Sequence, residues 1–267
     1  MPSTYAHFRF GKRVLERLDA DARRIVERHR ALFDIGLHGP DVLFHFRAFT
    51  HNPVNRLGHD MHRWTGRRFV EQALPAVLDD ASRAYFYGFL CHFALDSTCH
   101  GLIEQTATDT GIDHNTVEST FERALMLSDG LDPARHLPAA HFAPSRRMGQ
   151  VIAAFFPGVE PGQVTQAVRA MKRNINLLVA QTPLKRRFIQ TVLRAAGQYD
   201  ALYGLVTPET PDPRLNPCIR QLTELFTTAE ATAARLIALT GSSAQLSDPQ
   251  LLLDFDGQTT QPKEVSA

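Results

Sequence analysis

Helical periodicity runs through almost the whole chain, and no segment shows the alternation of apolar and polar residues that is typical of a half-buried strand. Residues 11–33 carry spaced apolar side chains amid many Arg and Asp residues, which predicts an amphipathic helix. Residues 164–178 carry a narrow apolar stripe, and residues 184–197 and 214–240 have similar patterns. Such stripes usually face a hydrophobic core rather than a cofactor. We therefore predict an all-α fold, a multi-helix bundle.

The length of 267 residues suits one large domain with a substantial core. We expect a single all-α domain over residues 1–240 and a partly ordered tail over residues 241–267. Residues 36–58 are rich in Gly, Pro, Asn and His, which predicts a loop. No charge-free stretch reaches the length of about 18 apolar residues that a transmembrane helix needs, so we expect none.

Two features bear on the cellular compartment. The three cysteines form neither a CxxC pair nor an even disulfide set, which favours a reducing compartment. The N-terminus lacks the basic and apolar regions of a signal peptide. We expect a cytoplasmic protein.

All twelve histidines lie between His7 and His141, and the rest of the chain has none. A random scatter would rarely give this distribution. Histidine is the commonest metal ligand among side chains. We therefore expect the chemistry to lie in the N-terminal half of the chain.

The central motif is His92-x3-Asp96-x3-His100, within a very apolar segment predicted to be helical over residues 81–103. Residues four apart lie on one face of a helix, one turn from each other. Burying such side chains is costly unless something pairs with them, and a divalent cation does so directly. The alternative is a buried ion pair with hydrogen-bonded core histidines.

A second motif, His114-x3-Glu118, falls on a helix predicted for residues 114–127. Alone it is weak, because the same pattern often occurs on a helix surface. Two antiparallel helices would place His100, His114 and Glu118 around one metal. Two nitrogens and one carboxylate leave a coordination position open, which is the pattern of catalytic zinc.

The predicted loop contributes Gly36-Leu-His-Gly-Pro-Asp41 and Gly58-His-Asp-Met-His62. Glycine and proline allow a fixed, irregular path that aims a carboxylate inward, although Asp41 alone would equally suit a turn cap. The further candidates, which the sequence alone ranks poorly, are His38, His45, His51 and His59.

Taken together, residues 4–125 resemble the zinc-dependent phospholipase C family, which is related in fold to the fungal single-strand-specific zinc nucleases. The matching elements are Ala-His7-Phe-Arg-Phe-Gly, Gly-Leu-His-Gly-Pro-Asp41, Gly58-His-Asp-Met-His62, His92-x3-Asp96-x3-His100 and His114-x3-Glu118. Their order and spacing agree with the family. The resemblance implies a helical bundle of the phospholipase C and zinc nuclease type, with its metal site in residues 7–118 and further helices in the second half.

The resemblance also implies two or three zinc ions. One would be held by Asp41, His62, His92 and Asp96, because the family's spacing from Gly58 favours His62 over His59. A second would be held by His100, His114 and Glu118, and a third would be shared by His7 and a bridging Asp96. In the family an N-terminal tryptophan completes the third site, and this sequence has none. Either Pro2 takes its place after removal of Met1, or only two ions bind.

The implied activity is hydrolysis of a phosphoester by metal-activated water, with Asp41 as a proton acceptor and Asp96 as the bridging carboxylate. The expected substrate is a phosphoester small molecule or a phospholipid headgroup. Alternatives are a single-strand nuclease and a non-catalytic metal-binding protein of the same fold. A formal net charge of +1 argues against stable nucleic-acid binding.

Overall fold

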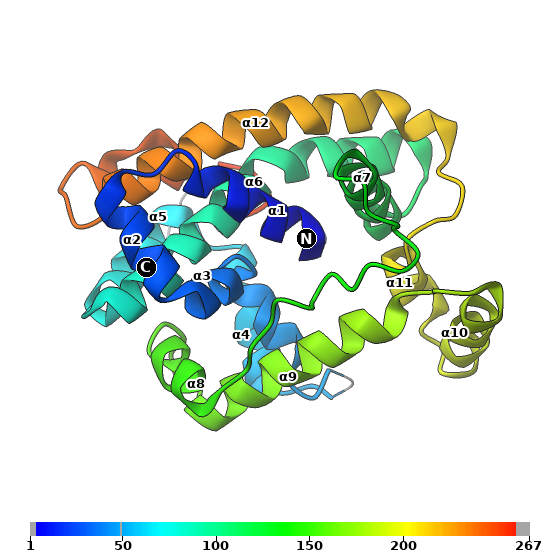
Figure 1. Ribbon diagram of the computed structural model, residues 1–267, viewed down its shortest axis with the longest axis horizontal. Coiled ribbons are helices and arrows are strands. Elements are labelled where there is room, and N and C mark those ends of the chain that lie inside the picture. The colour runs from blue at the N-terminus through cyan, green and yellow to red at the C-terminus, as the bar shows by residue number, and fades with distance from the viewer. Residues whose placement is uncertain (1–3, 49, 260–267) are drawn as a thin grey trace, which may run out of the picture.

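The computed structural model describes residues 4–48 and 50–259. Its helices are α1 (Thr4–Leu15), α2 (Ala20–Arg28), α3 (Arg30–Gly36), α4 (Pro53–His62), α5 (Gly66–Ala73), α6 (Asp80–Thr110), α7 (His114–Ser128), α8 (Arg146–Ala153), α9 (Pro161–Leu178), α10 (Pro183–Ala195), α11 (Tyr199–Leu202) and α12 (Asn216–Ala238) (Figure 1). The short 3₁₀ turns are η1 (Gly39–His45), η2 (Leu74–Ala76), η3 (Tyr203–Leu205), η4 (Pro213–Leu215), η5 (Gln245–Ser247) and η6 (Pro249–Leu252). The described residues contain no strand, only an isolated bridge between Leu253 and Thr259. The all-α prediction is confirmed.

Two local predictions were wrong. The single helix expected over residues 11–33 is divided among three. Asp19 caps the start of α2 by accepting a hydrogen bond from the Ala22 N–H, and His29 separates α2 from α3. The loop expected over residues 36–58 already contains η1 and the start of α4. There Asn52 accepts hydrogen bonds from the first turn of α4, and Pro53 provides the dihedral angle that suits a first helical position.

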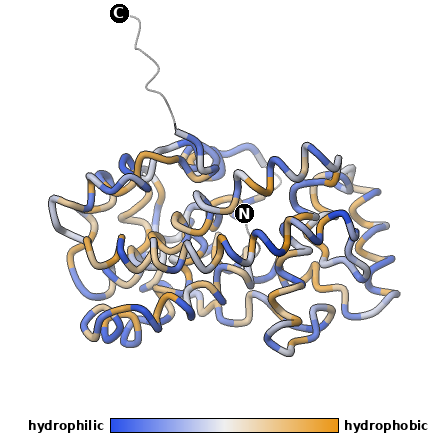
Figure 2. Tube along the Cα trace, turned by 90° about the horizontal axis from the view of Figure 1, so that it is seen from above, coloured by the Kyte–Doolittle hydropathy of each residue, from blue (hydrophilic) through white to orange (hydrophobic). Residues whose placement is uncertain are grey.

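Helix α6 is the centre of the molecule, and both α3 and α12 pack along it (Figure 1). It begins at a capping box formed by Asp79 and Ser82 and ends at Gly111, whose φ of 68° is left-handed. From residue 81 to residue 100 its side chains are buried on nearly every face, whereas its last turns are largely exposed. The other helices are amphipathic, with hydrophobic and hydrophilic residues alternating along them (Figure 2). None of the described helices has both the length and the apolar character needed to cross a membrane.

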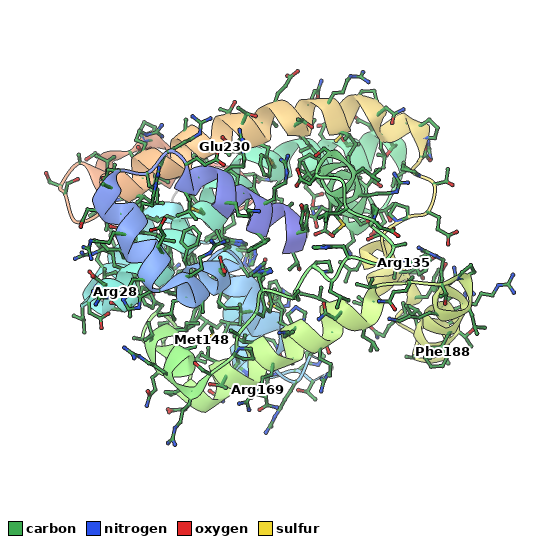
Figure 3. The ribbon with its side chains drawn as sticks, viewed as in Figure 1. Arg28, Arg135, Met148, Arg169, Phe188 and Glu230 are labelled. Atoms are coloured by element: carbon green, nitrogen blue, oxygen red, sulfur yellow. The ribbon has the colours of Figure 1, made fainter. Side chains whose placement is uncertain are left out.

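A buried carboxylate joins α12 to α1. Glu230, 2% exposed, accepts hydrogen bonds from Arg13 at 3.3 Å and from Arg17 at 2.9 Å. Figure 3 shows Glu230 on α12 above α1. This pairing fixes α1 against the bundle, and α1 carries His7.

Two glycines let α3 approach α6 closely. A β-carbon at Gly88 would lie 2.2 Å from the Phe33 carbonyl oxygen, and one at Gly36 would lie 2.3 Å from the Tyr85 carbonyl oxygen. Any larger side chain would force the helices apart. Because η1 follows α3 directly, this contact also brings η1 against α6.

The core has one large hydrophobic cluster and a small separate one. The small cluster joins α10 to the segments before and after it through Ala180, Ile189, Leu193 and Val206. The tail expected from residue 241 falls partly on residues 260–267, which lie outside the described residues. In its described part, η5 and η6 lead to a tight turn that packs against α6.

Candidate metal centre

Five elements bring the eight predicted ligands together. These residues are His7 on α1, Asp41 on η1, His62 on α4, His92, Asp96 and His100 on α6, and His114 and Glu118 on α7. Most are buried, whereas the His62 and His114 side chains are 15% and 26% exposed. The site is therefore enclosed, with these two histidines nearest to solvent.

Asp96 lies at the middle of the cluster. Its Oδ1 atom is 3.2 Å from His7 Nε2 and 3.9 Å from His100 Nε2. Its Oδ2 atom is 3.2 Å from His92 Nε2. The two oxygens thus face different histidines, as a carboxylate that bridges two cations requires.

Asp41 forms the second centre of contacts. Its Oδ1 atom lies 2.9 Å from His62 Nε2, and its Oδ2 atom lies 3.9 Å from His92 Nε2. The other ring nitrogen of His62 is 2.9 Å from the Gly58 carbonyl oxygen, which sets the orientation of the ring. That partner leaves Nε2 of His62 directed at Asp41.

The third group lies between α6 and α7. Glu118 Oε1 is 3.4 Å from His100 Nε2 and 2.9 Å from His114 Nε2. His114 Nδ1 is 2.6 Å from Glu104 Oε1. Asp113 caps α7 by accepting a hydrogen bond from the Thr116 N–H, and His114 is the first residue of the helix.

Three sets have ligand atoms close enough to hold one ion each, within 4.8 Å of one another. They are His7, Asp41 and His92; His62, His92 and Asp96; and His100, His114 and Glu118. The third set equals the predicted second site. The first two sets share His92 and together contain the four residues predicted for one zinc. They also include His7, which lies close to Asp41 as well as to Asp96.

The buried polar atoms of this cluster fit a bound cation. Most buried side-chain nitrogen and oxygen atoms that lack a hydrogen-bond partner in the described part of the chain belong to His7, Asp41, His62, His92, Asp96 and His100. They face each other at ionic distances but without hydrogen-bond geometry. Leaving them so costs free energy, which a divalent cation offsets by coordinating them. Imidazole and carboxylate are the donors that zinc takes.

Two members of the cluster, His92 and Asp41, already have the protonation state of a metal ligand. Burial lowers the pKa of His92 to about 4, although Asp96 and Asp41 oppose this change, so the ring is neutral at pH 7. Burial alone would raise the pKa of Asp41, but His92 and His62 bring it below its ordinary value. Neutral imidazole and ionised carboxylate are the forms that coordinate metal ions. At His62 and His100, burial lowers the pKa but neighbouring carboxylates raise it above its ordinary value, so a cation that binds these rings displaces a proton.

The remaining histidines lie outside these sets. His59 is exposed and stacks on Phe44, with ring centroids 4.4 Å apart. His38 is buried with its Nε2 atom 3.2 Å from His141 Nε2. His45 Nδ1 lies 3.4 Å from Asn174 Nδ2. Of the two histidines on α4, His59 and His62, it is His62 that contacts Asp41.

Sequence reasoning missed a contribution from the far end of the chain. The Phe255 ring lies 5.8 Å from the His92 ring and 5.4 Å from the His62 ring. Asp256 Oδ1 lies 3.2 Å from His100 Nδ1. The Asp-Gly pair at residues 256–257 predicts a turn, but nothing in the sequence indicates where that turn packs.

Comparison with known proteins gives one family. A family described as zinc dependent phospholipase C matches residues 6–147, which include all eight predicted ligands. Comparison with curated proteins and with solved structures gave no significant match.

Proposed function

Because this chain belongs to the zinc-dependent phospholipase C family, we propose that it is a zinc-dependent hydrolase of phosphoester bonds, with a phospholipase C-like reaction. The observation that carries the proposal is the buried Asp96 carboxylate, whose two oxygens face His7 and His92. So many buried ionisable groups disfavour folding unless cations coordinate them. A structural role would need only one closed site, whereas this cluster offers three sets, two of which share His92.

We assign two or three zinc ions to the cluster. Asp41, His62, His92 and Asp96 would hold one, and His100, His114 and Glu118 would hold another. His7 and Asp96 would share the third. Its remaining ligand, for which Pro2 is our candidate, lies outside the described residues. Zinc bound here supplies Lewis-acid chemistry, making water more acidic and neutralising negative charge on the phosphoryl oxygens.

The side chains of the chain itself supply the rest of the reaction. Asp41, ionised and next to His62, accepts a proton at a carboxylate oxygen from the water that attacks phosphorus. Asp96 keeps the histidines of α1 and α6 at fixed separations. Phe255 and Phe89 pack against His92 and exclude bulk water from that side. No covalent intermediate with the protein is required.

A cavity of about 520 Å³, lined in part by residues of α4, is our candidate for the site of the part of the substrate that does not react. Phe44 connects the cavity to the cluster, because it lines the cavity and stacks on His62 with centroids 5.2 Å apart. The other lining residues are mostly polar or charged, including Asn55, Arg56 and Arg63. This lining suits a polar group esterified to phosphate, such as a phospholipid headgroup or a small phosphoester, better than acyl chains.

The test combines metal analysis with a substrate panel. Zinc per chain is measured on purified protein, and hydrolysis is assayed with short-chain phospholipids of several headgroups and with soluble phosphodiesters. We expect two or three zinc equivalents and zinc-dependent release of a phosphomonoester. If the protein binds zinc but cleaves no member of the panel, the hydrolase proposal fails and a metal-binding role remains. Protein without zinc would overturn the proposal.

A further inference from the structure

The segment after η6 folds back over the cluster as a tight turn. The Asp254 N–H donates to the Gln258 carbonyl oxygen at 2.9 Å, and the Asp254 carboxylate accepts from the N–H groups of Asp256 and Gln258. Gly257 has a φ of 75°, a left-handed value that glycine adopts without strain. These bonds fix the direction in which residue 256 extends from the turn.

The turn is attached on two sides. Its Leu253 carbonyl oxygen accepts from the Gly66 N–H at 2.8 Å, and the Phe255 N–H donates to the His62 carbonyl oxygen at 3.3 Å. A β-carbon at Gly257 would lie 2.5 Å from the Ser97 carbonyl oxygen, so the turn lies directly against α6. The position of residue 256 is therefore set by the same helices that carry the predicted ligands.

Asp256 reaches the ring nitrogen of His100 that faces away from the cluster. Nε2 of His100 lies 3.4 Å from Glu118 Oε1, while Nδ1 lies 3.2 Å from Asp256 Oδ1. A histidine that binds a metal through one nitrogen usually donates its other N–H to a carboxylate or carbonyl, which fixes the tautomer and makes the ligating nitrogen more basic. We propose that Asp256 is a positioning residue that orients His100 for the zinc ion held with His114 and Glu118.

The other histidine of this set has a matching partner. Glu104 Oε1 lies 2.6 Å from His114 Nδ1, on the side away from Glu118. Both ring nitrogens of each histidine thus face carboxylates, one within the set and one outside it. Asp256 differs in coming from beyond the segment that matches the family, residues 6–147. The C-terminal segment is in this way part of the metal centre.

The inference rests on the proposed zinc site, and its test measures zinc affinity rather than hydrolysis alone. Full-length Asp256→Ala, Asp256→Asn and wild-type proteins are titrated with zinc against a chromogenic chelator. Gln258→Ala is the matched control, because Gln258 is an exposed residue of the same turn. Thermal unfolding of the zinc-free proteins tests whether the turn itself is preserved.

We expect Asp256→Ala to weaken one zinc equivalent by about 10–100-fold and to leave the others unchanged. Asp256→Asn should recover part of this loss, because its carbonyl oxygen still accepts a hydrogen bond. Zinc-free Asp256→Ala should unfold like the wild type, since Asp256 is 46% exposed.

Three outcomes would overturn the inference. They are wild-type zinc affinity in Asp256→Ala, an equal loss in Gln258→Ala, and an equal loss at every zinc equivalent. If the wild type binds zinc and cleaves substrate, any of these three outcomes overturns the role of Asp256 but leaves the proposed function intact. If the single equivalent weakens as expected but no phosphoester is cleaved, the role of Asp256 stands and the hydrolase proposal fails.

Discussion

Gly39 lies directly against the His92 ring, where a β-carbon at residue 39 would stand 2.2 Å from His92 Cδ2. Gly39 also has a φ of 44°, which side-chain-bearing residues rarely adopt. Only glycine therefore lets η1 pass this close to α6. The approach matters because Asp41 follows two residues later and must reach His62 and His92.

Replacing Gly39 by alanine should disturb the metal centre. The added methyl group would displace His92 or η1, and we expect a loss of about 1–3 kcal/mol in the free energy of unfolding together with reduced bound zinc. Chemical denaturation and metal analysis check this. Gly101→Ala is the control, because a β-carbon at Gly101 in α6 has no neighbour within 4 Å. Equal behaviour of the two variants would contradict the packing argument.

Asp96→Asn should lower bound zinc and abolish hydrolysis. Asparagine keeps the size of the side chain but removes the charge, and only one of its two polar atoms can accept from or coordinate a neighbour. Because loss of an outer partner alone costs about 10–100-fold in affinity or activity, loss of the central carboxylate should cost at least as much. Zinc content and turnover are measured together. Full zinc with near-normal turnover would remove the basis of the proposed site.

His100, His114 and Glu118 should behave as one unit. Each supplies one of only three protein ligands to its ion, so replacing any of them by alanine should remove the same single zinc equivalent. Elemental analysis of the three variants checks this. Glu224→Ala, an exposed position on α12, is the control. Unchanged zinc in Glu118→Ala would argue that the carboxylate serves the packing of α7 instead.

His62→Ala and His59→Ala form a matched pair on α4. Only His62 contacts Asp41, whereas His59 is exposed and stacks on Phe44. We expect His62→Ala to lose zinc and activity and His59→Ala to keep its zinc. Metal loss confined to His59→Ala would mean that the ligand lies one helical turn earlier.

The parts of the site that depend on local geometry could be predicted from the sequence. His92, Asp96 and His100 share one face of α6 because residues four apart always do so in a helix. His114 and Glu118 follow the same rule on α7. The all-α fold follows from the same periodicity, repeated along the chain.

The parts that depend on long-range packing could not be predicted. Asp256 and His100 are 156 residues apart in the chain, and the turn at Gly257 says nothing about the helix it contacts. The start of α4 was missed for a different reason. The Asn52-Pro53 pair is equally typical of a turn and of a helix start, and only its hydrogen bonds distinguish the two.

The final prediction concerns Asp248, which begins the segment that leads to Asp256. Its carboxylate accepts from Arg235 at 2.7 and 3.1 Å and caps η6 by accepting from the Gln250 N–H at 2.9 Å. Burial would raise the pKa of Asp248, but these hydrogen bonds from Arg235 and the backbone lower it below its ordinary value. The ionised carboxylate is therefore more stable in the folded state than in the unfolded state.

The sign of the pH dependence follows from this lowered pKa. Asp248 stabilises the fold at pH values above the unfolded pKa of about 3.9, and this contribution is lost as the pH falls through the folded value.

Asp248→Asn should lower the free energy of unfolding by about 1–2 kcal/mol near pH 7, since Arg235 is half-exposed and solvent weakens the pair. Denaturant unfolding of the zinc-free wild type and variant from pH 7 to pH 3 gives the difference between their free energies of unfolding. Titration of the metal ligands affects both proteins alike and cancels from this difference. We expect the difference to shrink below about pH 4. A difference that stays constant over this range would show that Asp248 acts through its shape and capping rather than its charge.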